Sequence, residues 1–179
     1  MSETISIYDS VAPNYDSRYQ TPDCLIENQQ VLSLINTTSN LGRVLDIGCG
    51  TGLLYELLTN SMCIPHFSHY TGVDPSKGMI DNFSQKLRDA DNRVKLLNDT
   101  VESCTLTECY DSIFSLFGAI SYVEPSYIRS LTINQGVLMF YRSGYRPDYL
   151  PMSVKTYTAQ DSGLEVTHRV NNFDVVVFK

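Results

Sequence analysis

The segment VLDIGCGTG, residues 44–52, constrains the fold of this chain more than any other part of its sequence. It joins an apolar run to an acid, Asp46, and then to three glycines at alternate positions, Gly48, Gly50 and Gly52. Glycine is required where the backbone turns with a positive φ or passes close to a ligand. The pattern therefore predicts a buried strand that runs into a loop binding a small cofactor.

A second acid follows a second apolar strand. Gly72, Val73 and Asp74 precede a helix, and Asp74 comes 28 residues after Asp46 (74 − 46). This interval matches the one at which Rossmann-type folds place the acid that holds a ribose. Two acids at two strand ends predict one nucleoside-shaped site.

Glycine spacing and charge distinguish two kinds of ligand for this site. A pyrophosphate needs the spacing G-x-G-x-x-G and a helix N-terminus without nearby negative charge, whereas this chain has G-x-G-x-G. Asp46 would repel phosphates, but it would attract a cofactor that carries an α-amino group and a sulfonium. S-adenosylmethionine fits that description.

Six segments then resemble, in order, landmarks of the class I S-adenosylmethionine-dependent methyltransferases. They are YDSVAPNYDSRY, LDIGCGTG, GVDPSKGMI, LLND, YDSIFSLFGAISYV and FDVVVFK. The resemblance covers nearly all of the chain and implies an α/β fold, a Rossmann-like doubly wound seven-stranded sheet in the order 3-2-1-4-5-7-6 with an antiparallel C-terminal hairpin. It also implies a single methyltransferase-like domain over residues 1–179, with residues 1–40 as an N-terminal lid and helix and residues 41–179 as the cofactor-binding core.

The hydrophobic pattern predicts alternating strands and helices. Short apolar runs typical of buried parallel strands occur at residues 43–47, 94–97, 111–116 and 136–141, and a further strand ends at Asp74. Helices are expected to begin at Thr21 and Ser76, which supply capping hydroxyls. The apolar residues at helical spacing that we expect to pack are Leu25, Leu32, Ile35, Leu53, Leu54, Leu57, Leu58, Met79, Phe83 and Leu87.

The C-terminal residues change to a period of two, which predicts a half-buried strand. Leu164, Val166, His168 and Val170 alternate with polar residues, and two asparagines then form a turn signal before residues 173–178. We therefore expect an antiparallel hairpin. His168 shares the apolar face, so we expect it to be a packed, hydrogen-bonded core residue.

Cofactor contacts follow from the residues and the resemblance together. Asp74 is expected to accept both ribose hydroxyls, the alternative being a simple acid at a helix start. Asp99 is the adenine candidate, with an Asx-turn as the alternative, and Cys49 fills space without acting as a nucleophile. The residues assigned to cofactor binding are Tyr15, Asp46, Gly48, Cys49, Gly50, Asp74, Pro75, Met79, Asp99, Thr100, Val101 and Ser115.

The N-terminal tyrosines and the end of the strand predicted at residues 111–116 supply the other candidates. By resemblance, the segment with Tyr8, Tyr15 and Tyr19 folds over the cofactor and helps to form the substrate pocket. Surface packing is the alternative, which is plausible for Tyr8 and Tyr19 and less so for Tyr15, and we expect Tyr15 to line the site. Methyl transfer is an in-line displacement that depends mainly on positioning, so a base is not obligatory. Ser115 and Phe117 are where the methyl donor should point; the candidate bases are Tyr15, Tyr122 and Glu124.

Composition argues against several other classes of protein. The formal net charge is −7 and the basic residues are scattered, which argues against a nucleic-acid partner. Neither N-P-P-Y nor D-P-P-Y is present, which argues against methylation of adenine or cytosine.

Five cysteines without C-x-x-C spacing (positions 24, 49, 63, 104 and 109) and three isolated histidines predict no disulfide and no metal site. Apolar runs shorter than the ~20 residues of a membrane span and the absence of a leader predict a cytoplasmic protein without a membrane partner.

The leading hypothesis is a methyltransferase that uses S-adenosylmethionine to modify a small molecule. One alternative is a non-catalytic subunit or regulator that binds the cofactor. The short stretch after the strand predicted at residues 136–141 would favour it, because little material is left for a substrate lid. A second alternative is an enzyme that cleaves S-adenosylmethionine. All three would bind the same cofactor.

Overall fold

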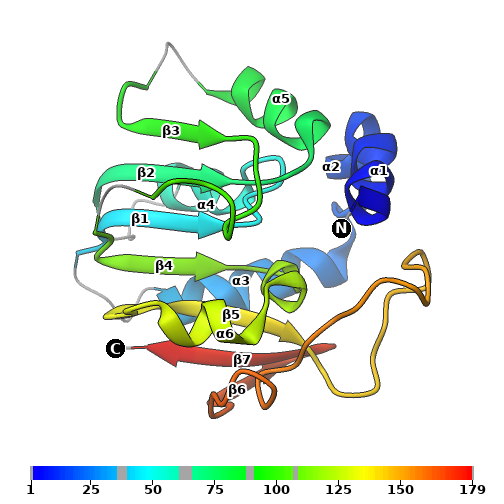
Figure 1. The fold of residues 1–179 in the computed structure, drawn as a ribbon. Helices are drawn as coiled ribbons and strands as arrows, with labels where there is room; N and C mark the ends of the chain where they lie inside the picture. Colours follow the sequence, from blue (N-terminus) through cyan, green and yellow to red (C-terminus); the bar gives the residue numbers. More distant parts are fainter. Residues whose placement is uncertain (1, 36–39, 61–65, 88–90, 107–108, 179) are drawn as a thin grey trace.

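The structure, a computed structural model, describes residues 2–35, 40–60, 66–87, 91–106 and 109–178. Its centre is a seven-stranded sheet in the order β3-β2-β1-β4-β5-β7-β6 (Figure 1). The strands are β1 (Gly42–Ile47), β2 (Phe67–Val73), β3 (Val94–Leu97), β4 (Ser112–Ser115), β5 (Gln135–Tyr141), β6 (His168–Val170) and β7 (Phe173–Phe178). The first five are parallel and β7 is antiparallel to both of its neighbours, which confirms the predicted topology.

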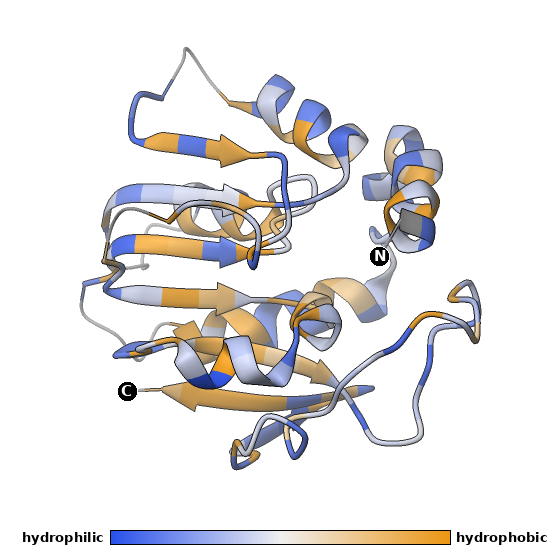
Figure 2. Ribbon diagram, in the orientation of Figure 1, coloured by the Kyte–Doolittle hydropathy of each residue, from blue (hydrophilic) through white to orange (hydrophobic). Residues whose placement is uncertain are grey.

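Helices cover both faces of the sheet. They are α1 (Ser2–Val11), α2 (Tyr15–Arg18), α3 (Pro22–Ile35), α4 (Leu53–Asn60), α5 (Lys77–Lys86) and α6 (Pro125–Ser130), with single 3-10 turns η1 (Ala12–Asn14) and η2 (Ala119–Tyr122). In Figure 1, α3 and α4 lie behind the sheet and α6 lies in front of it. One buried cluster joins α3, α4 and α5 to one face, and a second joins η2 and α6 to the other. Parallel sheets need cover on both faces, and Figure 2 shows the resulting apolar strands.

The two predicted helix starts are observed. Ser76 Oγ accepts a hydrogen bond from the Met79 amide at 3.2 Å, and Thr21 Oγ1 accepts one from the Cys24 amide at 3.3 Å. Leu54, Leu58, Met79 and Phe83 are buried as expected. Leu25 is wrong as a packing residue, because 52% of it is exposed and α3 instead buries Val31 and Ile35.

The C-terminal hairpin is shorter than predicted. Only His168–Val170 pair with β7, and residues 164–167 lie outside the strand. His168 is exposed, with its Nδ1 atom 2.9 Å from Thr167 Oγ1, so the prediction of a packed core histidine is wrong. β6 is a three-residue edge strand in which Val170, on the same face, is buried, so the core covers that face at the end of the strand and leaves His168 at its start exposed.

Residues 142–167, between β5 and β6, form a long irregular segment that returns across the carboxyl edge of the parallel strands (Figure 1). The Arg146 guanidinium organises it by donating hydrogen bonds to the carbonyls of Leu150, Pro151 and Val154. The expectation that little material follows strand five for a lid is therefore wrong. The local sequence pattern did not show it, because only the last residues of the segment, from Leu164, carry a strand-like alternation, and they lie outside β6.

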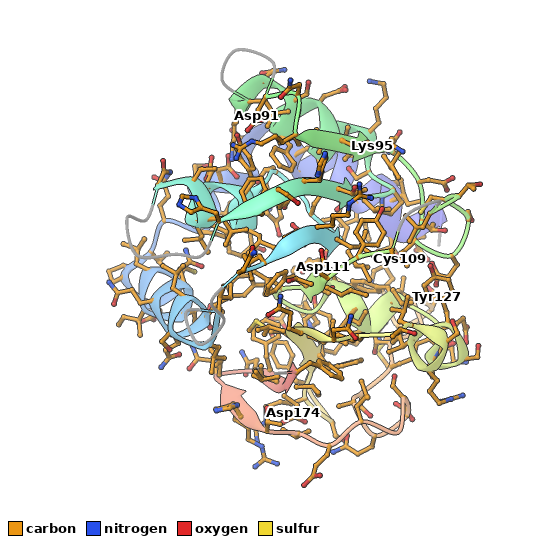
Figure 3. All side chains as sticks on the ribbon, turned by 90° about the vertical axis from the view of Figure 1, so that its left-hand side faces the viewer. Asp91, Lys95, Cys109, Asp111, Tyr127 and Asp174 are labelled. Atoms are coloured by element: carbon orange, nitrogen blue, oxygen red, sulfur yellow. The ribbon has the colours of Figure 1, made fainter. Side chains whose placement is uncertain are left out.

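The opposite edge of the sheet carries structural polar contacts (Figure 3). Asp111 Oδ2 accepts from the Arg43 amide at 2.8 Å, and Asp91 pairs with Arg93 at 2.7 Å. The Arg93 guanidinium lowers the pKa of Asp91 to about 2. Acids at this edge are thus occupied in holding strand ends together, unlike those at the carboxyl edge.

Candidate active site

The loop after β1 uses its glycines in two different ways. Gly48, Gly50 and Gly52 all have positive φ, at 72°, 53° and 92°. A Cβ atom on Gly48 would lie 2.2 Å from that of Ala119, and one on Gly52 would lie 2.4 Å from the Phe83 ring. A Cβ atom on Gly50 would meet nothing within 4 Å. The outer glycines therefore allow close packing as well as the turn, whereas Gly50 is needed for its conformation and leaves space beside the loop.

Asp74, directly after β2, ties the glycine loop to the start of α5. Its Oδ2 atom accepts from the Gly50 amide at 3.0 Å, and its Oδ1 atom accepts from the Ser76 amide at 2.9 Å. Burial raises the pKa of Asp74 to about 6, although both amide hydrogen bonds oppose that rise. Each carboxylate oxygen has a second lone pair, so the group can accept two further hydroxyl donors.

Asp46 is a buried carboxyl group near the end of β1, with 2% of its surface exposed. The fully buried Tyr70 hydroxyl donates a hydrogen bond to its Oδ2 atom. Burial raises the pKa of Asp46 to about 7, the hydrogen bond from Tyr70 lowers it, and the nearby charge of Asp74 raises it. A cation placed beside these two carboxyl groups would stabilise their ionised forms.

A cavity of about 480 Å³ opens at this carboxyl edge, a volume typical of small-molecule sites. The glycine loop, the ends of β2, β3 and β4, the N-terminal helices and residues 153–157 line it. It brings together eleven of the residues assigned to cofactor binding: Tyr15, Asp46, Gly48, Cys49, Gly50, Asp74, Pro75, Met79, Asp99, Thr100 and Val101. The candidate bases Tyr122 and Glu124 line the same cavity.

Ser115 needs a correction. Its side chain is fully buried, and its hydroxyl donates to the Ile47 carbonyl at 2.7 Å, so it joins β4 to β1 instead of facing the cavity. The next two residues, Leu116 and Phe117, do line the cavity. The difference follows from the end of the strand: Ser115 is the last residue of β4, whereas Leu116 and Phe117 lie beyond it, where Phe117 has a positive φ of 51°.

Asp99 lies at the cavity and also makes a hydrogen bond within its own turn. It lines the cavity at the end of β3, and its Oδ1 atom also accepts from the Thr100 amide at 2.7 Å, a local turn contact. Beside it, the Asn98 side-chain amide donates to the carbonyls of Asp74 and Pro75, both at 3.0 Å. The ends of β2 and β3 are therefore held side by side at the cavity.

The N-terminal helices are attached to this edge by hydrogen bonds to two aspartates, of which Asp9 is exposed and Asp16 is partly buried. Asp9 Oδ1 in α1 accepts from Ser76 Oγ at 2.6 Å and from the Gly78 amide at 2.9 Å, so it caps α5 from outside. Asp16 Oδ1 in α2 accepts from Thr51 Oγ1 at 2.5 Å, next to the glycine loop. These contacts place the N-terminal tyrosines over the cavity.

Four tyrosine hydroxyls meet near the cavity, and we call Tyr8, Tyr122, Tyr141 and Tyr149 the phenol cluster. The Tyr8 oxygen lies 3.3 Å from that of Tyr122 and 3.2 Å from that of Tyr149, and the Tyr122 oxygen lies 3.3 Å from that of Tyr141. Burial raises the pKa of all four phenols. Each therefore keeps its proton at neutral pH, and the same holds for Tyr15, which argues against Tyr15 or Tyr122 as a base.

Sequence reasoning missed several residues of this lining. Tyr8, for which surface packing was left open, lines the cavity, and Glu3, Ser153, Lys155 and Tyr157 were not considered. The separation of seven residues between Tyr8 and Tyr15, two helical turns, could have placed both tyrosines on one side. No local signal identifies the residues of the 142–167 segment.

The described cysteines, Cys24, Cys49, Cys104 and Cys109, are free thiols, and Cys63 lies outside the described residues. Within the described ranges, no group of three or more His, Cys, Asp or Glu side chains could hold a metal ion. In the same ranges, no helix is long and apolar enough to cross a bilayer.

The fold and the cavity define a Rossmann-like protein with a nucleoside-type site at the carboxyl edge of its sheet. The methyltransferase domain family matches residues 44–135, just over half of the chain, which therefore belongs to the class I S-adenosylmethionine-dependent methyltransferases. This confirms the resemblance derived from the sequence. A comparison with curated proteins finds no match.

Solved structures share the fold. A chain of the complex between the Haloferax volcanii Trm112 methyltransferase activator and a methyltransferase is 15% identical, with a TM-score of 0.65 over 90% of this chain and 77% of that one. A protein from Methanococcus maripaludis described as an S-adenosyl-L-methionine-dependent methyltransferase is 22% identical, with a TM-score of 0.56 over 74% and 63%. The plantazolicin methyltransferase BpumL, solved with S-adenosylhomocysteine (SAH) and a pentazolic desmethylPZN analogue, is 16% identical, with a TM-score of 0.51 over 83% and 68%. The chain spans less than two thirds of the Methanococcus protein.

Proposed function

We propose that this protein transfers a methyl group from S-adenosylmethionine to a small-molecule acceptor. The observation that carries the proposal is the pair of buried carboxyl groups, Asp46 and Asp74, beside a glycine loop that leaves room for a ligand. Burying a carboxylate is costly unless a positive partner compensates it. A nucleoside that also carries an ammonium and a sulfonium is such a partner.

The cavity residues at the ends of β1, β2 and β3 fit the methionine, ribose and adenine parts of this cofactor in turn. Asp74 would accept the ribose hydroxyls, since its oxygens keep free lone pairs beyond their bonds to the Gly50 and Ser76 amides. Asp46 and Gly48 would hold the methionine end. Asp99 and the buried Val101 would contact the adenine, with Cys49, Pro75, Met79 and Thr100 completing the wall on this side.

Positioning is the main task of the chain in the reaction. The bound cofactor supplies an activated methyl group, so the protein needs to hold an acceptor in line with it and exclude water. Residues 2–18 and 142–167, which we call the cover, close over the cavity and are joined by hydrogen bonds from Ser153 Oγ to Glu3 Oε2 at 2.7 Å and between Tyr8 and Tyr149. Glu124 lines the cavity and would receive a proton where the acceptor must lose one.

The cover favours a small acceptor over a macromolecule. It closes the cavity with segments from both ends of the chain, and the net charge of −7 opposes binding to nucleic acid. The similarity to a chain solved with the Trm112 activator supports one alternative, in which the protein acts with an activator subunit on a larger substrate. A non-catalytic cofactor-binding role and cleavage of S-adenosylmethionine also remain alternatives.

Two experiments test the proposal. Calorimetric titration should show binding of S-adenosylmethionine and SAH, and failure to bind either at millimolar concentration would refute the proposed cofactor. Incubation with methyl-labelled S-adenosylmethionine and a cell extract should then move label into a small metabolite. Label on a macromolecule would contradict the acceptor class, label on methylthioadenosine would indicate cleavage, and label left on intact cofactor would indicate a binding protein.

A further inference from the structure

The part of the cavity beyond β4 differs in chemistry from the part over β2 and β3. We call it the acceptor compartment; it is lined by Tyr8, Tyr15, Phe117, Tyr122, Glu124 and Tyr157. These residues come from the N-terminal helices, which lie beside α5 in Figure 1, from the chain after β4 and from the 142–167 segment. Five of the six are aromatic, so the compartment has predominantly ring walls.

The rings around Tyr8 meet at steep angles. The Tyr8 and Tyr122 ring centroids are 6.4 Å apart at 79°, and those of Tyr8 and Tyr149 are 6.2 Å apart at 78°. Tyr15 lies 6.4 Å from Tyr8 at 58°. Tyr8, Tyr15 and Tyr122 therefore bring rings of different orientation to the cavity that they line. A ring face that is open to the cavity is suited to a cation, because it carries negative electrostatic potential.

The phenol cluster adds hydrogen-bond acceptors to these walls. Each phenol brings one proton and two lone pairs, so the four bring four protons. The three contacts at 3.2 to 3.3 Å use three of those protons, and a hydrogen bond between Tyr141 and Tyr149 uses the fourth, so none is left to donate to a ligand. Since lone pairs remain in excess, the cluster matches a ligand that donates hydrogen bonds more closely than one that accepts them.

Charged groups around the compartment reinforce this preference. Glu3, Glu102 and Glu124 line the cavity, and Lys155 is the one lysine or arginine among the described residues that do so. The Lys155 ammonium is exposed and lies 4.5 Å from the centroid of the Tyr157 ring, whose hydroxyl donates to Glu124. The local balance is therefore negative, and the lysine is already partnered within the protein wall.

We infer that the methyl acceptor is a small molecule with a basic amine, held by the tyrosine rings and phenol oxygens of the acceptor compartment. This inference rests on the proposed methyl transfer. The incoming ammonium first loses a proton to water or to Glu124. The nitrogen lone pair then forms the N–C bond as the S–C bond breaks, sulfur keeps that electron pair, and the products are an N-methylammonium and SAH. The positive charge moves from sulfur to nitrogen, where the ring faces stabilise it.

The test uses the full chain saturated with SAH and three probes of similar shape. Choline carries a methylated ammonium, 3,3-dimethylbutan-1-ol is its neutral carbon analogue, and 3,3-dimethylbutanoate is an anion. Binding is measured by titration calorimetry or by ligand-observed NMR. We expect choline to bind at least fivefold more tightly than the neutral alcohol and the anion to bind most weakly.

Matched variants locate the effect. Tyr122→Leu removes a ring and should abolish the preference for choline, whereas Tyr122→Phe keeps the ring and should retain it within about twofold. The SAH affinity of each variant reports on its folding. If Tyr122→Leu does not bind SAH, Glu124→Gln takes its place, and this variant should reduce the preference for choline over the neutral alcohol. Equal or undetectable binding of choline, or tighter binding of the alcohol or the anion, would overturn the inference. Loss of SAH binding by the unaltered protein would instead refute the cofactor assignment.

Discussion

The two ends of the cavity are built in different ways. At the cofactor end, the key contacts join residues close in sequence: the Gly50 amide to Asp74 and the Tyr70 hydroxyl to Asp46 each span 24 positions. At the acceptor end, Tyr8 meets Tyr122 and Tyr149, which are 114 and 141 positions away. The cofactor end therefore uses carboxyl groups carried by adjacent strands, and the acceptor end uses neutral phenols brought together by the cover. This difference teaches that a shared cofactor requires a local, motif-like structure, while the acceptor site is free to differ.

The largest expected effect is on the cofactor end. Asp74→Ala removes the acceptor for the ribose hydroxyls and should weaken SAH binding by about ten- to a hundredfold, since bonds to a charged group contribute about 1.5 to 3 kcal/mol. Titration calorimetry measures the change. Asp91→Ala is the matched control, because this acid lies at the opposite edge of the sheet and should alter stability without altering affinity. Unchanged affinity in Asp74→Ala would show that the ribose role is wrong.

The next effect is a pH dependence with opposite signs for binding and stability. The pKa of Asp46 is about 7 in the free protein, above the value of 3.8 for an ordinary aspartate, so the folded state takes up a proton between these values. Stability of the free protein should therefore fall as pH rises from about 4, and the fall should level off above about pH 7. Between pH 6 and pH 8 the expected loss is on the order of 1 kcal/mol.

Affinity for S-adenosylmethionine should show the reverse trend, because its cationic groups need the ionised carboxylate. Titrations at pH 8 and pH 6 should differ by about tenfold, with tighter binding at pH 8. The Asp46→Asn variant should bind weakly at both pH values and lose most of this dependence. A wild-type affinity that does not vary between these pH values would separate Asp46 from cofactor binding.

A smaller effect concerns the attachment of the cover to the cofactor end. Asp9→Ala removes the acceptor for Ser76 Oγ and the Gly78 amide, and should cost about 1 kcal/mol of stability, as the loss of a helix cap does. Amides of residues 2–18 should exchange faster with solvent in the variant, and SAH should slow them in both proteins. Asp23→Ala, in the first turn of α3, provides the comparison. If the N-terminal exchange rates of Asp9→Ala equalled those of the wild type, the cover would be held by other contacts.

The smallest effect is expected at the acceptor end alone. Tyr149→Phe removes one hydroxyl from the phenol cluster but keeps the ring, and a hydrogen bond between neutral groups contributes about 0.5 to 1.5 kcal/mol. The variant should act through Tyr8, the partner of Tyr149 that lines the cavity. For ethanolamine, whose primary ammonium can donate to a phenol oxygen, we expect a loss of affinity of about two- to tenfold, with SAH affinity unchanged. A comparable loss of SAH affinity would contradict the division of the cavity into two independent ends.

Much of the cofactor end could be predicted from the sequence because its constraints are local. The alternate glycines need positive φ, Asp46 and Asp74 follow apolar runs of strand length, and Ser76 caps the helix that begins beside it. Parallel strands bring their carboxyl ends to one edge, so the acids had to lie together. Ser115 does not line the cavity because its hydroxyl donates to the Ile47 carbonyl, a contact between two strands that the local sequence pattern does not show.

The sequence by itself determined the glycine loop, the parallel strands and the pair of acids, since each depends on backbone conformation or hydrophobic period within a few residues. Only the tertiary structure decided that Tyr8 faces the cavity, that His168 faces water and that residues 142–167 cover the sheet edge. It also decided that Asp9 caps a helix almost seventy positions later in the chain. The physical reason is that these contacts join distant segments, whose positions depend on packing of the whole chain and leave no periodic signal in any one of them.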